Sequence, residues 1–140
     1  MKRFCVIDGQ GGGIGALIVK KLRERFGETV EILAVGTNAI STSQMMKSGA
    51  NRGATGENPV VQTVGKVDFI LGPVAVMWPN AMMGELTLAM AEAIASSPAP
   101  KILIPLHQEK VVIVGAGQEP LPHLVDMVIN KHLKEVLNDV

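Results

Sequence analysis

The residues in this chain that could do chemistry begin with a glycine cluster after the first apolar run. Five glycines fall within seven residues of the segment Asp8-Gly9-Gln10-Gly11-Gly12-Gly13-Ile14-Gly15. A phosphate at the start of a helix meets free backbone N–H groups and the positive end of the helix dipole, and side chains there would obstruct it. The segment therefore predicts a site for the phosphate of a nucleotide or another phosphorylated small molecule. The alternative is that the glycines only make a tight turn and allow close helix packing.

The spacing of Gly9, Gly13 and Gly15 has the Gly-x-x-x-Gly-x-Gly form of a dinucleotide-binding turn. It is not an ATPase-type phosphate loop, because no Gly-Lys-Ser/Thr follows. Asp8 could bind ribose hydroxyls or a Mg²⁺ that arrives with the ligand, or it could brace Gly9 in an Asx-turn.

Further candidate contacts follow the other predicted strands. Where an NAD enzyme would carry an acid for the ribose and an NADP enzyme an arginine, this chain has Gly36, Thr37 and Asn38, so dinucleotide specificity is unsupported. The remaining candidates expected at the same rim are Thr55, Glu57, Asn58, Gly72 and Pro73.

No residue is assigned a catalytic role, and no metal site is predicted. His123 and His132 lie nine residues apart and do not share a helix face at metal-ligand spacing. His107 is interpreted as a turn residue, and the acid Glu85 as one that suits a helix dipole. The apolar segment 77–83 is interpreted as core or subunit interface in preference to a lid.

Apolar runs and helical periodicity alternate along the chain. Strands are expected at 4–7, 30–35, 67–71, 102–106 and 111–114, and helices at 14–27, 39–48, 58–64, from Asn80 or Gly84 to about 97, and from Pro120 onward. This order predicts one α/β domain over residues 1–140, a three-layer Rossmann-like and mostly parallel sheet of about five strands in the order 2-1-3-4-5. Only four residues separate the last two strands, so they are expected to form an antiparallel edge hairpin. Ligands of such sheets bind beyond the carboxyl ends of the strands, here between the loops after the first and third strands.

The composition limits the partners. The chain has 140 residues, 47% of them hydrophobic and 19% charged, with 13 basic and 13 acidic side chains. The apolar excess predicts a homo-oligomer. The charge balance argues against nucleic acid as the main partner, and no apolar stretch reaches the length of a membrane span. With no secretory signal and a single cysteine, the expected location is the cytoplasm.

Read as a whole, the chain resembles a family of short bacterial proteins, found mainly in Firmicutes, that is known only as a conserved domain of unknown function. The resemblance implies no activity, because none is assigned to that family. The matching segments span nearly the whole chain and are residues 6–15, 36–39, 53–58, 68–73 and 101–106.

Two partial resemblances carry more chemistry. Residues 8–15 are similar to the Thr-Gly-x-x-x-Gly-Ile-Gly opening of short-chain dehydrogenases, but those enzymes need a Tyr-x-x-x-Lys pair and this chain has no tyrosine. Dehydrogenase chemistry is therefore rejected. The chain also resembles phospholactate transferase and its UDP-sugar-binding relatives, which implies a nucleoside diphosphate in preference to a nicotinamide. The segments that carry this resemblance are 11–15, Asp68, 72–73, 79–80, 91–94 and 99–101.

The preferred function is that of a sensor or carrier that binds a nucleotide or another phosphorylated small molecule without turnover. One alternative is a small transferase that acts on a nucleoside-diphosphate ligand. The other is a structural homo-oligomer subunit whose glycines serve packing alone.

Overall fold

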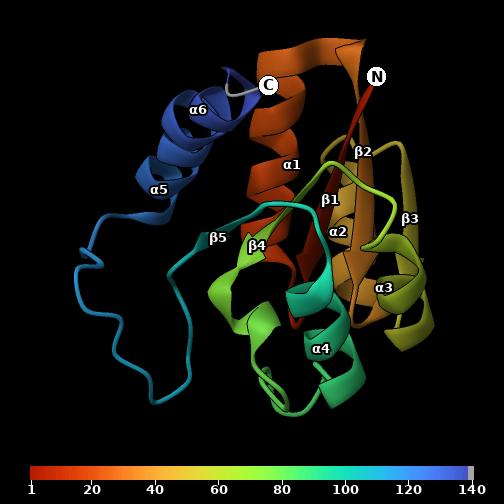
Figure 1. Ribbon diagram of the computed structural model, residues 1–140, viewed down its shortest axis with the longest axis vertical. Coiled ribbons are helices and arrows are strands. Elements are labelled where there is room, and N and C mark those ends of the chain that lie inside the picture. The colour runs from red at the N-terminus through yellow and green to blue at the C-terminus, as the bar shows by residue number, and fades with distance from the viewer. Residues whose placement is uncertain (139–140) are drawn as a thin grey trace.

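Five parallel strands form one sheet in the computed structural model, which describes residues 1–138. The strand order is β3-β2-β1-β4-β5, and helices cover both faces (Figure 1). The strands are β1 (Lys2–Asp8), β2 (Val30–Gly36), β3 (Arg52–Thr55), β4 (Phe69–Pro73) and β5 (Lys101–Ile104). β1 lies at the centre because residues 4–7 are apolar on both faces, and all four are fully buried.

Helices α1 (Gly13–Phe26) and α2 (Ala39–Lys47) pack on one face of the sheet together with the C-terminal helices. These are α5 (Leu121–Met127) and α6 (Leu133–Asn138), joined by the π-helical turn η3 (Val128–His132). The other face is covered by α3 (Glu57–Thr63), α4 (Leu88–Ser96) and the 3₁₀ turn η2 (Val74–Met77). A further 3₁₀ turn, η1 (Gly27–Thr29), leads from α1 into β2. The chain therefore forms the three α/β layers that the alternating pattern predicts.

The two edges of the sheet differ from the sequence-based prediction. β3 pairs in parallel with β2, although residues 52–55 are polar or small and all four are exposed. A strand that buries no side chain has no apolar pattern to reveal it. β3 lies at the edge next to β2, where no strand was predicted. The predicted fifth strand, residues 111–114, was expected at the opposite edge.

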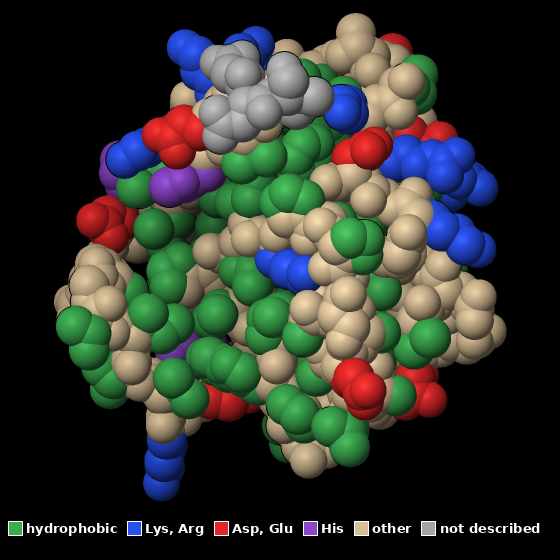
Figure 2. Space-filling model, viewed as in Figure 1, with side chains coloured by type: hydrophobic (Ala, Val, Ile, Leu, Met, Phe, Trp, Pro, Cys, Tyr) green, Lys and Arg blue, Asp and Glu red, His purple; other side chains and the backbone are tan. Residues whose placement is uncertain are grey.

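The predicted antiparallel hairpin is wrong. Residues 111–114 form part of a long loop between β5 and α5 that projects from the body of the molecule (Figure 1). Val112 and Val114 are 89% and 95% exposed. Figure 2 shows hydrophobic side chains on the side from which this loop projects. The β-branched residues of segment 111–114 do not form a strand, because no strand of the sheet pairs with this segment.

Helix α4 also begins later than predicted. Asn80, Met82 and Met83 have φ values of 68°, 59° and 57°, a left-handed conformation that a right-handed helix excludes. Thr87 is the N-cap, and its hydroxyl accepts a hydrogen bond from the Met90 N–H at 3.2 Å. The start of α3 differs as well, because the helix begins at Glu57 with Gly56 as its N-cap, one residue before the predicted start at residue 58. Residues 79–87, which come before α4 and include the left-handed residues, form a compact turn, called the 79–87 turn below.

The single cysteine, Cys5, lies in β1 and is completely buried. Burial raises the pKa of its thiol to about 12. Within residues 1–138, no helix is both long and apolar enough to cross a membrane.

Candidate functional site

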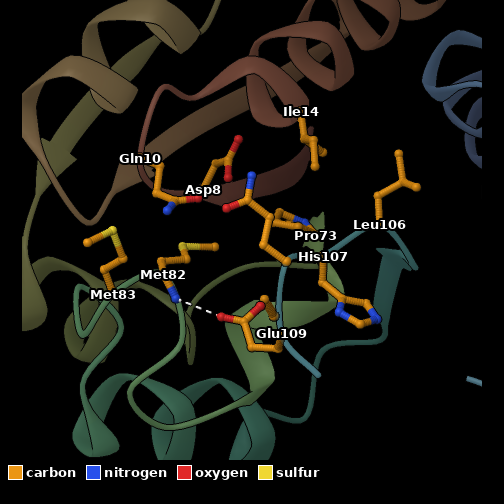
Figure 3. Close-up of a pocket in the computed structure, with 11 residues that line it drawn as sticks. Asp8, Gln10, Ile14, Pro73, Met82, Met83, Leu106, His107 and Glu109 are labelled. Atoms are coloured by element: carbon orange, nitrogen blue, oxygen red, sulfur yellow. Dashed lines mark hydrogen bonds between the residues drawn. The ribbon is translucent and has the colours of Figure 1, made fainter. Parts of the chain in front are cut away.

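A cavity of about 360 Å³ lies at the carboxyl ends of β1 and β4. Here the chain leaves β1 toward α1 on one face of the sheet and leaves β4 toward η2 and α4 on the other, so the two connections diverge. In Figure 3, Met82 and Met83 lie on one side of Asp8, and Leu106 and His107 on the other. The lining residues are Asp8, Gln10, Ile14, Pro73, Ala75, Met82, Met83, Leu106, His107, Gln108 and Glu109.

The Asp8 carboxylate closes the inner side of the glycine loop. Its Oδ1 accepts a hydrogen bond from the Gly9 N–H at 2.8 Å, and its Oδ2 accepts one from the Gly15 N–H at 2.7 Å. Burial raises the pKa of Asp8 above its ordinary value, although both N–H donors act in the opposite direction. Asp8 therefore bonds to the first residue of the loop and to the first turn of α1, and it makes no Asx-turn because the Gln10 N–H donates to Glu85 instead.

A second carboxylate, that of Glu85 in the 79–87 turn, covers the top of the loop. Its Oε1 accepts hydrogen bonds from the Gln10 N–H at 2.8 Å, the Thr37 hydroxyl at 2.6 Å and the Asn38 side-chain amide at 2.8 Å. Burial raises the pKa of Glu85, but the three donors together outweigh it, so this pKa lies below its ordinary value. Thr37 and Asn38, which were predicted as ligand contacts, therefore bind a side chain of the protein itself.

Three glycines of the loop are explained by packing and backbone conformation, and we call them the inner glycines: Gly9, Gly12 and Gly15. A Cβ on Gly15 would lie 2.6 Å from Met45 Sδ, and one on Gly12 would lie 2.7 Å from Ser41 Cα. Gly12 also has a φ of 75°, which favours glycine. A Cβ on Gly9 would overlap the side chains that cover the loop.

The other two glycines, Gly11 and Gly13, are not explained in this way, and we call them the outer glycines. A Cβ on either would meet nothing within 4 Å, and both residues are exposed. Neither has a left-handed φ. Their backbone N–H groups make no hydrogen bond within residues 1–138. The N–H groups of both outer glycines are therefore free donors near the start of a 14-residue helix.

The interior of the cavity is acidic and apolar. Asp8 and Glu109 contribute carboxylates, and no Lys or Arg belongs to the lining within the described residues. Glu109 accepts a hydrogen bond from the Met82 N–H at 3.0 Å (Figure 3). The His107 ring packs edge-on against Trp78, and its buried Nδ1 has no partner in the described part of the chain. Such walls suit a ligand that carries hydroxyl or amine donors on a partly apolar body.

Of the predicted residues at the ends of β2 and β4, only Pro73 lines the cavity. Gly36 and Gly72 are required by packing, because a Cβ on Gly36 would collide with Thr42 and one on Gly72 with the Ile7 carbonyl oxygen. These two glycines let helix α2 and strand β1 approach closely.

The end of β3 and the start of α3 do not contribute to the cavity. The Thr55 hydroxyl lies 2.7 Å from that of Thr42, and Glu57 accepts a hydrogen bond from the Thr87 hydroxyl at 2.6 Å. Asn58 is exposed. None of the three predicted residues, Thr55, Glu57 and Asn58, is among the residues that line the cavity.

Several site residues were missed in the sequence. Residues 106–109 line the cavity, but the sequence assigned them to the expected hairpin. Met82 and Met83 line it too, although segment 77–83 was assigned to the core or an interface. Nothing in the sequence indicates that Glu85 contacts the glycine loop, because its partners lie 47 to 75 residues away. Within residues 1–138, no group of three or more His, Cys, Asp and Glu side chains could hold a metal ion.

A family model described as "Domain of unknown function (DUF3842)" matches residues 3–137. The chain belongs to the DUF3842 family. No curated protein matches the DUF3842 chain.

Two solved structures are distantly similar to the DUF3842 chain. One is a dodecameric FMN-dependent Ubix-like decarboxylase from Escherichia coli O157:H7, with a TM-score of 0.48 and 14% identity over 96% of this chain and 77% of that one. The other is a universal stress protein in complex with cAMP, with a TM-score of 0.42 and 14% identity over 74% of this chain and 98% of that one.

Proposed function

We propose that this protein binds a nucleotide or another phosphorylated small molecule and acts as a sensor or carrier. The phosphate contacts the N–H groups of Gly11 and Gly13, and the rest of the ligand enters the cavity beside them. The observation that carries the proposal is that these two glycines serve neither packing nor backbone conformation, whereas their three neighbours do. Open space and free N–H donors at a helix start are what an approaching anion requires.

The cavity supports a ligand with donors next to its phosphate. Its volume, about 360 Å³, falls within the range typical of small-molecule sites, about 300–1,000 Å³. Asp8 and Glu109 would accept hydrogen bonds from hydroxyl groups, which a ribose supplies. The same carboxylates oppose a phosphate inside the cavity, so the anionic group belongs at the outer glycines.

Binding without turnover is preferred over the transferase alternative. The lining holds no Ser, Cys or Lys side chain, within the described residues, that could serve as a nucleophile. The proposal that copies of the chain associate is supported by the exposed valines of the loop between β5 and α5.

Thermal-shift measurements with nucleoside mono- and diphosphates, nucleotide sugars and nicotinamide dinucleotides test the binding proposal. A ligand at 100 times its Kd should stabilise the protein by about 2.7 kcal/mol. Gly13→Val should abolish this shift, because its side chain projects into the space that the phosphate needs. Gly65→Val is the matched control, since a Cβ there also meets nothing within 4 Å and lies outside the cavity lining.

Three outcomes distinguish the alternatives. A shift that Gly65→Val retains and Gly13→Val loses supports the proposal. Consumption of the responding ligand over hours would favour the transferase. No response to any compound would contradict the proposal and favour a structural subunit. Equal shifts in both variants would contradict the assignment of the phosphate to the glycine loop.

A further inference from the structure

Three hydrogen-bond donors from two strand ends converge on a single oxygen atom. The Gln10 N–H follows β1, and the side chains of Thr37 and Asn38 follow β2; all three reach Glu85 Oε1 at 2.6–2.8 Å. The lack of a side chain on Gly9 leaves room for that oxygen, since a Cβ there would lie 3.0 Å from it. The donors sit on the ends of paired parallel strands, so their positions are fixed by the sheet.

Thr37 and Asn38 are anchored independently of Glu85. The Thr37 N–H donates to the Asp8 carbonyl oxygen at 3.0 Å. Asn38 Oδ1 accepts from the Ser41 N–H at 2.8 Å, and its amide nitrogen also donates to the Gln10 carbonyl oxygen at 2.9 Å. The donor set would therefore keep its geometry if the carboxylate left.

The segment that carries the carboxylate is held in a costly conformation. Asn80, Met82 and Met83 all have positive φ, a conformation that costs roughly 1–2 kcal/mol for each non-glycine residue. Met83 is 96% exposed, so its side chain gains little from packing in return. Glu85 bonds the 79–87 turn to the glycine loop at Gln10 and to the end of β2 at Thr37 and Asn38, and the Met82 N–H bonds it to Glu109 in the loop between β5 and α5.

We propose that the Gln10 N–H, the Thr37 hydroxyl and the Asn38 amide form a second anion subsite, which takes a phosphate oxygen of the ligand and which Glu85 fills in the free protein. A carboxylate oxygen and a phosphate oxygen are both negatively charged acceptors with several lone pairs, so the same donors can bind either one. Glu85 is then an internal competitor, and the ligand must displace it. This inference rests on the proposed function, because the same ligand occupies the outer glycines.

The position of the subsite specifies the ligand class. Gln10 and Gly11 are consecutive, so the second subsite and the outer glycines lie on adjacent peptide units. A diphosphate group has negatively charged oxygens on two adjoining phosphorus atoms and can place one phosphate at each set of donors, whereas a monophosphate must share the oxygens of one phosphorus atom between them. The favoured ligands are therefore diphosphates, and removal of Glu85 should help them more than monophosphates.

Displacement of Glu85 would also change the cavity. Met82 and Met83 belong to the same turn and line the cavity. The Ala81 N–H donates to the Trp78 carbonyl oxygen at 3.2 Å, which links the turn to the single tryptophan of the chain. Trp78 fluorescence therefore reports the position of the turn.

Titration of the whole protein with inorganic pyrophosphate and inorganic phosphate, followed by calorimetry and Trp78 emission, tests the inference. If Glu85 fills the subsite about nine-tenths of the time, Glu85→Ala should tighten pyrophosphate binding about tenfold, because the competent fraction rises to one. Phosphate binding should tighten less. Glu92→Ala is the matched control, because it removes an exposed carboxylate of α4 that makes no hydrogen bond to the glycine loop within residues 1–138.

A second variant separates a freed subsite from a mere loss of charge. Thr37→Val in the Glu85→Ala background removes one of the three donors and should reverse most of the gain. Glu85→Gln, which keeps an acceptor oxygen but no charge, should give a gain of about threefold, and it replaces Glu85→Ala if that variant fails to fold. The wild-type protein should show the Trp78 emission of Glu85→Ala once pyrophosphate saturates it.

Pyrophosphate affinity in folded Glu85→Ala or Glu85→Gln equal to that of wild type and Glu92→Ala would overturn the inference, as would a gain that Thr37→Val leaves unchanged. The failure of the proposed function would look different. In that case Gly13→Val would leave binding intact in both the wild-type and the Glu85→Ala background, whatever Glu85→Ala does.

Discussion

The inner and outer glycines lie within one loop, yet they have different surroundings. Around Gly9, Gly12 and Gly15 the space is filled and the N–H groups of the inner side are bonded, two of them to Asp8. Around Gly11 and Gly13 the space is empty and the N–H groups are free. The glycines of one cluster can therefore have different roles. The inner glycines are needed to form the turn, and the outer glycines leave space and N–H donors that a ligand can use.

The largest effect is expected when the same side chain is placed at an inner and at an outer glycine. Gly15→Val should lower the free energy of unfolding by about 3 kcal/mol, because its methyl groups would overpack the space beside Met45 and Asp8. Gly13→Val should change it by less than about 0.5 kcal/mol, as surface substitutions usually do. Urea denaturation measures both values. Similar losses in the two variants would show that the outer position is not open.

The contact of Glu85 with the loop can be weighed through its pH dependence. Glu85→Gln should lower the free energy of unfolding by about 1–2 kcal/mol at pH 7, because the acceptor of three donors loses its charge. The pKa of Glu85 is lowered in the folded state, so its contribution is present above the ordinary value of 4.5 and is lost as the pH falls through the lowered value. The difference between variant and wild type should therefore shrink below about pH 4, as followed by urea denaturation across pH. A constant difference over this range would contradict the charge-based explanation.

Asp8 should show a smaller effect of the opposite sign. Its pKa is raised in the folded state, so the favourable contribution of its protonated form is complete below the ordinary value of 3.8 and is lost as the pH rises through the raised value. Asp8→Asn does not titrate, so its stability relative to wild type should improve as the pH rises above about 4. At pH 7 the net change should be less than about 1 kcal/mol, since one N–H loses its acceptor while the burial of a charge is avoided. Thermal unfolding between pH 3 and 7 measures this trend, and a decline in relative stability would contradict it.

The central sheet could be predicted because its strands are buried on both faces. Residues 4–7, 30–35 and 67–71 are short, mostly apolar runs followed by aspartate or glycine, and they overlap with β1, β2 and β4. The edge strand β5 also overlaps with the predicted strand 102–106, but the remaining edge features could not be predicted in this way. β3 buries no side chain, and residues 111–114 have the composition of a strand but no partner.

The site was predictable only where it is local in sequence. The glycine loop and residues 36–38 could be singled out because each directly follows a predicted strand. The contact of Glu85 with Gln10 spans 75 residues, and it depends on a left-handed turn at two methionines, a conformation with no sequence signal because methionine rarely adopts it. The split between inner and outer glycines likewise depends on neighbours that come from α2 and the 79–87 turn.

The buried thiol in β1 has a consequence for how this protein can be studied. Since burial keeps Cys5 protonated at neutral pH and out of contact with solvent, alkylating reagents can modify it only when the central strand separates from its neighbours. The rate of modification therefore measures how often the sheet opens at its middle. The glycine loop continues directly from this strand. A compound that binds the loop and stabilises the folded strand should therefore slow the labelling of Cys5 without contacting its sulfur atom.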